Sequence, residues 1–248
     1  MSGDLTIHSL ADRPDLAEHM WELGRLWPDF VFGDPTADLF YGRCTTTFAE
    51  LSFVVEDPAE PGVVQARAHA VPFAMRGDEL PDGGWDAVVR WGIEDAIDGR
   101  STDEVSALEI TIRPDHRGTG LAARLIATLR EAAAERGATR LVAPVRPTLK
   151  SIEPHEPIDA YAQRTRPDGL PADPWLRTHV AAGGTIERVA PQSMVISGTL
   201  GQWREWTGAA FDTDGPTVAA GALVPVLVDV GRDLGVYVEP NVWVSHPT

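Results

Sequence analysis

Short apolar stretches with a strand-like pattern alternate along the chain with longer stretches that repeat at helical spacing. The strands expected from this pattern are 5–9, 51–55, 63–71, 107–112, 139–145, 185–189 and 193–200. The expected helices are one that begins at Asp12 or Asp15 and runs to about Trp27, then 37–47, 85–98, one with its apolar face at 121–129 and Gly137 as C-cap, and 173–180. This alternation of strands and helices predicts a mixed α/β fold.

The remaining sequence, 201–248, has a different character. It holds Trp203, Trp206 and Tyr237, followed by the run Glu239 to Trp243. We expect it to be rich in β-structure and to pack on the same domain as residues 1–200. The sequence shows no internal repeat, so two tandem copies of one domain are disfavoured.

The composition sets the class of protein. The chain has 248 residues, is 43% hydrophobic and carries a formal charge of −16. Such an acidic chain lacks the basic clusters that bind nucleic acid, and no apolar run is long enough to cross a bilayer. Residues 1–7 do not resemble a signal peptide, and the single Cys44 excludes an intrachain disulfide. We therefore expect a cytoplasmic protein without a membrane or nucleic-acid partner; a homodimer stays open.

The most specific motif lies between the strand 107–112 and the helix that follows it. Residues 117–122 read R-G-T-G-L-A, with Gly118 and Gly120 placed where the chain must turn tightly into a helix. Backbone N–H groups at such a helix start can bind an anion such as a pyrophosphate. A Walker loop is excluded, because Lys150 is the only lysine and no G-K-[ST] occurs.

Arg117 to Ala122 match the pattern [QR]-x-x-G-x-[GA] at every fixed position, and in this the chain resembles the GNAT superfamily of N-acetyltransferases. The resemblance implies a central, partly splayed mixed sheet flanked by helices over residues 1–200, with 201–248 as a C-terminal extension. It also implies acetyl-CoA or another acyl-CoA as co-substrate. The cofactor-binding residues that it indicates are Ile110, Thr111, Ile112, Arg117, Gly118, Thr119, Gly120, Leu121 and Ala122. The seven histidines are scattered without the paired spacing of metal ligands, so we expect no metal.

The resemblance also suggests groups for proton transfer. Glu109 stands in the cofactor strand where some members of the family carry a catalytic glutamate, so it is the candidate base. The family acid is a tyrosine in Y-x-x-x-G, and here His179 occupies that position before Gly183. Tyr161 is the second candidate acid. For both Glu109 and His179 a purely structural role is an equal alternative.

Residues 147–174 form a long stretch rich in proline and charge, which favours an acceptor-side loop over simple packing. We expect the segment 150–173 and C-terminal aromatic residues such as Trp243 to form the wall that binds the acceptor. Trp175, Trp203 and Trp206 are further aromatic candidates, although tryptophans more often fill a core.

The chain is therefore predicted to be an N-acyltransferase that moves an acyl group, acetyl by default, from a CoA thioester to an amine of a small-molecule acceptor by direct attack. Two alternatives stay open. One is an acyltransferase of the same fold whose donor is a carrier protein. The other is a non-catalytic acyl-CoA-binding or regulatory module, which would keep the loop and dispense with Glu109 and His179. The sequence does not identify the acceptor.

Overall fold

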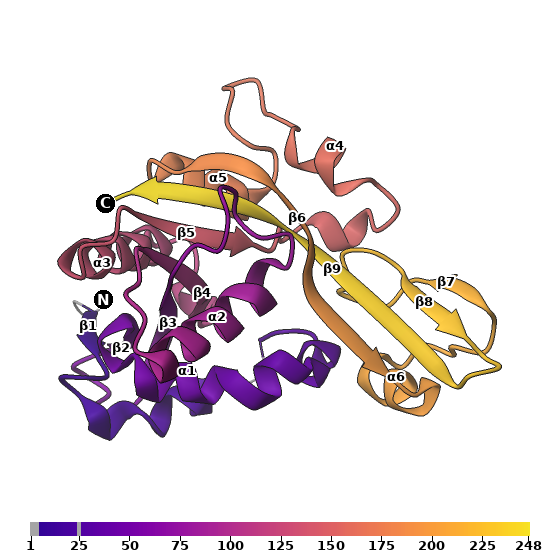
Figure 1. Ribbon diagram of the computed structural model, residues 1–248, viewed down its shortest axis with the longest axis horizontal. Helices are drawn as coiled ribbons and strands as arrows, with labels where there is room; N and C mark the ends of the chain where they lie inside the picture. Colours follow the sequence, from indigo (N-terminus) through magenta and orange to yellow (C-terminus); the bar gives the residue numbers. More distant parts are fainter. Residues whose placement is uncertain (1–4, 24–25) are drawn as a thin grey trace.

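The computed structural model describes residues 5–23 and 26–248, and it has a mixed α/β architecture (Figure 1). The strands are β1 (Thr6–Ser9), β2 (Ser52–Glu56), β3 (Val64–Phe73), β4 (Glu104–Ile112), β5 (Arg140–Val145), β6 (Thr185–Gly198), β7 (Gly215–Thr217), β8 (Val226–Asp229) and β9 (Leu234–Pro247). The α-helices are α1 (Gly42–Thr47), α2 (Gly84–Asp98), α3 (Leu121–Glu135), α4 (Ile158–Ala162), α5 (Pro174–Ala181) and α6 (Leu200–Thr207). The mixed α/β prediction is confirmed.

One sheet joins all nine strands, in the order β1-β2-β3-β4-β5-β9-β8-β7, with β6 paired to β9. Every pair is antiparallel except β4 and β5, which run parallel. The prediction of a partly splayed mixed sheet holds, because β4 and β5 pair only at Val105–Leu141 and Ser106–Val142. Beyond these two positions the strands separate.

The C-terminal residues belong to the main sheet. Strand β9 pairs with β5 over Val242 to Pro247, so the predicted boundary after residue 200 is crossed by sheet hydrogen bonds. The first half of β9 extends away from the main body together with β6. Strands β7 and β8 and helix α6 lie beside this extension (Figure 1). Trp203 and Tyr237 fill a second small core in this part, and both are fully buried.

Helices α2 and α3 pack on the main sheet, and each begins and ends as the sequence suggests. Helix α3 starts at Gly120 and buries Leu125 and Leu129 against the core. Helix α2 ends at Gly99, which adopts the left-handed conformation expected of a C-cap. Gly92 of α2 lies so close to β3 that a Cβ there would be 2.1 Å from Cγ2 of Val71.

The segment between β1 and β2 differs from the expected pair of helices. Short 3₁₀ turns η1 (Pro14–Leu16) and η2 (His19–Leu23) replace the helix predicted from Asp12 or Asp15 to Trp27, within which residues 24 and 25 lie outside the described residues. A third 3₁₀ turn, η3 (Asp29–Gly33), follows. The predicted helix 37–47 is present as a π-helical turn, η4 (Ala37–Tyr41), continued by α1. Prolines at 14, 28 and 35 divide this segment into pieces too short for regular helices.

Strand β6 is longer than predicted. The sequence suggested separate strands at 185–189 and 193–200, whereas the structure has one strand with an irregular register between Ala190 and Met194. Pro191 and its neighbours form this bulge, because proline offers no N–H to the ladder. The predicted break lies at the position of this bulge, but the chain does not turn there and β6 stays paired with β9 on both sides of it.

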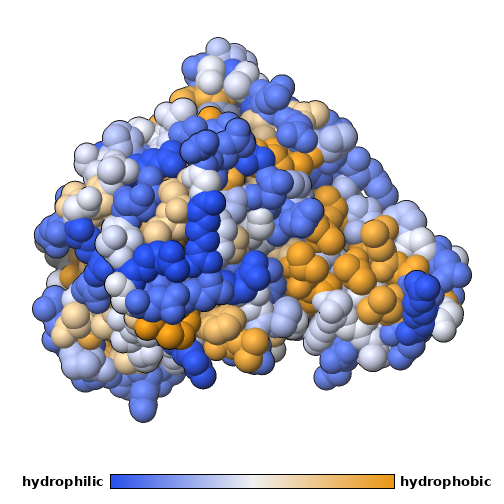
Figure 2. Space-filling view, viewed as in Figure 1, coloured by the Kyte–Doolittle hydropathy of each residue, from blue (hydrophilic) through white to orange (hydrophobic). Residues whose placement is uncertain are grey.

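The surface divides into two kinds of region. Hydrophilic residues cover most of the face seen in Figure 2, and apolar residues gather on the part that holds β7, β8 and the adjoining ends of β6 and β9. Exposed apolar side chains of this C-terminal part are Val195, Val218, Leu227 and Val230. None of the described helices is both long and apolar enough to span a membrane.

Candidate active site

A cavity of about 530 Å³ opens where β4 and β5 separate. This volume is in the range that holds a small organic ligand. Strands β4, β5, β6 and β9, helices α2 and α5, and the turns η2, η3 and η4 all contribute to its wall. The lining residues are Trp21, Trp27, Val31, Phe32, Ala37, Asp38, Tyr41, Arg67, Trp85, Ala107, Leu108, Glu109, Ile110, Ala143, Pro144, Val145, Arg146, Trp175, His179, Met194, Glu239 and Asn241.

Glu109 lies at the centre of a buried hydrogen-bond network in this cavity. Its Oε1 forms an ion pair with Nη2 of Arg67 at 2.9 Å, and both side chains are only 6% exposed. The hydroxyls of Tyr41 and Thr111 also donate to the carboxylate. Trp27 Nε1 donates to Oε1 of Glu109 at 3.3 Å. Donors from four separate stretches of chain therefore fix the position of this one carboxylate.

The network sets the charge states. Burial opposes ionisation of Glu109, but the positive charge of Arg67 and the hydrogen bonds outweigh it, so the pKa of Glu109 is lowered. Burial and the neighbouring carboxylate raise the pKa of Tyr41 well above its usual value. At neutral pH the cavity consequently holds an ionised Glu109 and a neutral Tyr41 phenol.

A bulge in β4 places Glu109 toward the cavity. His69 of β3 pairs with Glu109, and the next residue, Ala70, pairs with Ala107, which leaves Leu108 as one extra residue on β4. The Leu108 carbonyl accepts a hydrogen bond from Nε1 of Trp85 at 3.0 Å.

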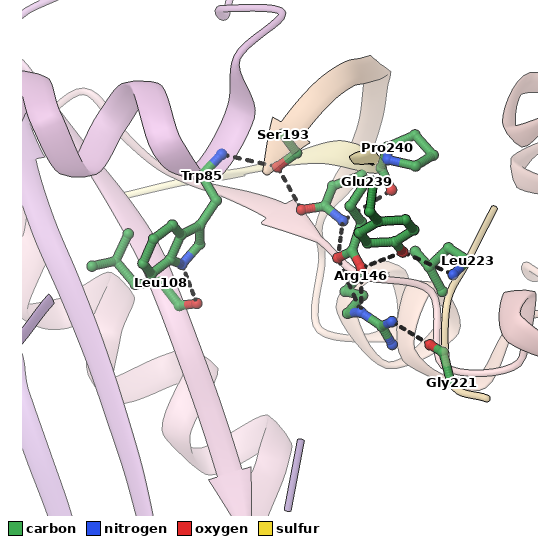
Figure 3. A network of polar contacts seen from close by, with 10 residues as sticks. Trp85, Leu108, Arg146, Ser193, Gly221, Leu223, Glu239 and Pro240 are labelled. Carbon is green, nitrogen blue, oxygen red and sulfur yellow. Dashed lines mark hydrogen bonds and ion pairs between the residues drawn. The ribbon is translucent and has the colours of Figure 1, made fainter. Parts of the chain in front are cut away.

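A chain of polar contacts forms the opposite wall (Figure 3). The hydroxyl of Ser193 accepts from the backbone N–H of Trp85 at 2.9 Å and donates to Oδ1 of Asn241 at 2.5 Å. Asn241 donates to Oε1 of Glu239 at 3.2 Å, and Nε of Arg146 contacts both oxygens of Glu239 at 3.0 Å. This wall is rigid because each of its buried polar groups has a partner.

His179 also reaches the cavity, on the side formed by α5. Its Nδ1 lies 3.0 Å from Nε2 of His246, and both rings are buried. Burial and the second imidazole lower the pKa of His179 to about 3, and burial lowers the pKa of His246 to about 4. His179 is therefore a neutral imidazole at pH 7, edge-on to the ring of Trp175 at 4.6 Å.

The predicted phosphate loop has the geometry of an anion site. Gly118 and Gly120 have φ values of 75° and 87°, and Gly120 is the N-cap of α3 without any side-chain cap on the first N–H groups. Residues 117–120 are exposed. Nε of Arg117 donates to the carbonyl of Ile112 at 3.2 Å, which joins the loop to the end of β4. The loop and Glu109 are thus positioned by the same strand.

Tyr161, the second candidate acid, does not line the cavity. It is buried, with its hydroxyl 3.0 Å from Oδ2 of Asp173, which in turn caps α5. The expected acceptor wall at 150–173 is also absent from the lining residues. This segment is instead tied down by Lys150, whose Nζ donates to the carbonyls of Glu153 and Leu223 at 2.7 and 2.8 Å.

Trp243, which we expected in the acceptor wall, does not line the cavity either. It is fully buried in the main core, where its Nε1 donates to the carbonyl of Pro81 at 2.9 Å. The residues of β9 that line the cavity are Glu239 and Asn241, which stand four and two positions before Trp243. Of the further aromatic candidates, Trp203 lies in the second core, whereas Trp175 lines the cavity.

The sequence reasoning missed the N-terminal side of the site. Trp21, Trp27, Asp38 and Tyr41 line the cavity from η2, η4 and the chain between them. Their only sequence signal was an aromatic density near residues 21–41 without regular spacing. Among the residues that the structure describes, no group of three or more His, Cys, Asp and Glu side chains is arranged to hold a metal ion.

Comparison with known proteins agrees with this geometry. The model of the Acetyltransferase (GNAT) family matches residues 66–154, which include β3, β4, the phosphate loop and β5. The arginine N-acetyltransferase avaD of Aspergillus versicolor is 36% identical over 273 aligned residues, which cover 98% of this chain and 93% of the relative. The similarity therefore includes both the cavity and the C-terminal part.

Two solved structures share the fold along the whole chain at 16% identity. They are the loading GNATL domain of CurA from Lyngbya majuscula, with a TM-score of 0.57, and the GphF GNAT-like decarboxylase in complex with isobutyryl-CoA, with a TM-score of 0.54. Each alignment covers 98% of this chain and at least 97% of the other, so the arrangement of residues 201–248 also has counterparts. The chain belongs to the GNAT family, and it is an acyltransferase enzyme that uses an acyl-CoA as co-substrate.

Proposed function

We propose that this protein transfers an acetyl group from acetyl-CoA to the amine of arginine or of a closely related cationic small molecule. The observation that carries the proposal is the cavity at the separation of β4 and β5, which places the Glu109 carboxylate on the strand that leads to the phosphate loop. The chain is 36% identical to an arginine N-acetyltransferase, in an alignment that covers 98% of the chain, and this similarity supports arginine as the acceptor.

Acyl transfer to an amine has a defined proton balance. The nitrogen lone pair attacks the thioester carbonyl, an N–C bond forms, the C–S bond breaks, and one proton passes from nitrogen to the departing CoA sulfur. An amine is mostly protonated at pH 7, so a nearby negative charge must attract it and a proton must leave before attack. Glu109 supplies this charge in our proposal.

Glu109 remains our candidate base, but its lowered pKa limits how long it can hold a proton. A carboxylate with a lowered pKa holds a proton only briefly, so it is suited to bind the ammonium and pass its proton on. The neutral phenol of Tyr41 donates to this carboxylate, which makes Tyr41 rather than Tyr161 the tyrosine within the cavity. We propose Tyr41, whose phenol keeps its proton at neutral pH, as the proton donor to the leaving thiolate; the lowered pKa of His179 leaves its imidazole without an acidic proton at pH 7.

The phosphate loop holds the co-substrate in this proposal. The free N–H groups at the start of α3 face solvent beside Gly118 and Gly120, where a pyrophosphate would complete their hydrogen bonding. The pantetheine arm would then enter between β4 and β5, along backbone groups of Ile110 to Ile112 that have no partner strand on the β5 side. Thioester and amine would meet at Glu109.

The proposed function is tested by incubating the purified protein with acetyl-CoA and arginine while measuring thiol release and N-acetylarginine by mass spectrometry. We expect product formation that saturates in both substrates. The variant Glu109→Gln should lower the single-turnover rate about 100-fold or more. The matched control is Glu104→Gln, since Glu104 is also a buried β4 glutamate paired with an arginine, Arg140 at 3.0 Å, but lies outside the cavity lining.

The possible results separate the alternatives. If acetyl-CoA binds by calorimetry but no amine is acetylated, the protein is an acyl-CoA-binding module and the proposal fails. If transfer occurs only from an acylated carrier protein, acetyl-CoA is not the donor, and only the part of the proposal that concerns the amine acceptor is retained. Equal loss of rate in Glu109→Gln and Glu104→Gln would show that ion-pair loss alone accounts for the effect.

A further inference from the structure

The charges that line the cavity do not balance. Two acidic side chains are already paired within the chain, because Glu109 contacts Arg67 at 2.9 Å and Glu239 contacts Arg146 at 3.0 Å. A third acid, Asp38, also lines the cavity, and its carboxylate contacts no donor among the described residues. Glu109 and Glu239 each share their charge with an arginine, so Asp38 is the lining acid that has no cation beside it among the described residues.

Local structure holds Asp38 in a defined place. It lies in the π-helical turn η4, a rare conformation that often marks functional positions. The start of the turn is fixed by Asp34, whose Oδ1 accepts from the N–H of Ala37 at 2.8 Å and whose carbonyl accepts from the N–H of Asp38 at 3.0 Å. Three residues on, Tyr41 donates to Glu109. The same turn therefore positions Asp38 relative to Glu109.

Aromatic rings accompany this carboxylate. Trp21 and Phe32 line the cavity although their side chains are 45% and 44% exposed. Trp21 already stacks on a guanidinium, since Cζ of Arg67 lies 5.1 Å from its ring centroid. The half-exposed indole of Trp21 beside the Asp38 carboxylate forms a favourable environment for a planar cation, which gains from both cation–π and charge-assisted contacts.

We propose that Asp38 is the residue that selects the acceptor, by binding the guanidinium group of an arginine-type molecule while its α-amine lies at Glu109. This inference rests on the proposed function and adds to it the recognition residue and the nitrogen that reacts. A guanidinium is not deprotonated at neutral pH, so it is a poor nucleophile and a good anchor. The α-amine loses its proton far more readily, and it attacks the thioester carbonyl as CoA thiol leaves.

The test compares the parent with Asp38→Asn, using arginine and citrulline as probes, because citrulline carries a neutral ureido group of similar shape. We measure the Kd of each probe by calorimetry in the presence of CoA, and the KM and kcat of acetylation. A hydrogen bond to a charged group corresponds to an affinity change of roughly 10- to 100-fold. We expect that increase in the Kd and KM of arginine, no change for citrulline, and an unchanged KM for acetyl-CoA.

The control is Asp98→Asn, which removes the same charge from an exposed end of α2, where the side chain is 59% exposed. It should leave every constant as in the parent, which excludes a general effect of surface charge. Asp38 is itself exposed, so a thermal melt should show that Asp38→Asn folds like the parent.

Distinct results bear on the inference and on the proposed function. An unchanged preference for arginine over citrulline in Asp38→Asn would overturn the inference, as would a product acetylated on the guanidine nitrogen. If arginine binds in an Asp38-dependent way but is not acetylated, recognition stands and the proposed reaction fails. If arginine does not bind to the parent at all, both are overturned.

Discussion

A buried pair of carboxyl groups behind the acceptor side of the cavity makes the stability of this protein dependent on pH. Asp86, near the start of α2, accepts from the N–H of Val195 at 3.1 Å, and Asp34 accepts from the N–H of Ala37. One oxygen of each, Oδ1 of Asp86 and Oδ2 of Asp34, has no other partner in the described part of the chain, and the two carboxyls face each other. We expect Asp86 to hold a proton at neutral pH and to share it with the carboxylate of Asp34.

Burial and the adjacent negative charge of Asp34 raise the pKa of Asp86 from 3.8 to about 8. The surrounding charges are Glu239 on β9, which opposes ionisation of Asp34, and Arg90 on α2, which lowers the pKa of Asp86 slightly. A group whose pKa is raised by folding stabilises the folded state at low pH, and that stability is lost as pH rises toward the folded-state pKa. The parent protein should therefore lose stability between pH 4 and pH 8.

The variant Asp86→Asn removes this titration while its amide can still donate to Asp34. Each pH unit within the window corresponds to about 1.4 kcal/mol for one proton, so the variant should gain about 3 to 4 kcal/mol relative to the parent between pH 5 and pH 8. The assay is urea unfolding of both proteins at several pH values. Titrations of groups other than Asp34, which lies beside Asp86, cancel in the difference.

Asp98→Asn is the matched control for this prediction, because Asp98 lies on the same helix and is exposed. Its difference from the parent should stay within about 0.5 kcal/mol at every pH, as expected for a surface substitution. Parallel curves for Asp86→Asn and the parent would refute the shared proton. They would mean that Asp86 is ionised in the folded protein despite its burial.

Three further predictions concern packing, the loop and the network. Gly92→Ala should cost about 1 to 3 kcal/mol in urea unfolding, because its Cβ would overlap Val71, whereas Gly42→Ala meets no atom within 4 Å and should cost nothing. Gly120→Asp should abolish acetyl-CoA binding by calorimetry through negative charge at the start of α3, and Gly137→Asp, at the other end of this helix with φ 77°, should retain it. Glu109 should contribute no inflection to the single-turnover rate between about pH 6 and 9, since its lowered pKa keeps it ionised there; an inflection lost in Glu109→Gln would contradict this.

The sequence was sufficient to predict the elements with regular spacing. Strand β4, the loop at Gly118 and Gly120, and helix α3 all lie where the apolar pattern and the glycines indicated. These features depend on local chemistry, namely helical spacing and positive φ. The separation of β4 from β5 followed from the resemblance to the GNAT family, and the structure bears it out.

The acceptor side could not be predicted, because its position depends on contacts between distant residues. The turn η2 is held by Arg67, whose Nη1 donates to the carbonyl of Met20 at 2.9 Å, and η4 is held by Asp34. Neither contact leaves a periodic signal in residues 19–41. The charged stretch 150–173 suggested a binding loop, yet its Arg164 pairs with its own Glu153 at 2.8 Å. Composition alone could not distinguish internal ion pairs from a ligand site.

Trp243 illustrates the same limit within one strand. Glu239, Asn241 and Trp243 share one face of β9, because side chains two positions apart in a strand point the same way, yet the first two line the cavity and Trp243 lies in the core. The sequence predicted β-structure here, but not which residues would line the cavity between β4 and β5. That depends on the pairing of Pro144 with Trp243, which is a tertiary property.

The most direct measurement is a structure of the protein in complex with CoA and arginine. We predict the pyrophosphate on the backbone amides of Gly118 to Ala122, the pantetheine arm between β4 and β5, and the arginine α-nitrogen within hydrogen-bond distance of Glu109. The guanidinium should lie on Asp38. A CoA molecule bound outside the separation of β4 and β5, or an arginine bound outside the cavity, would contradict the account.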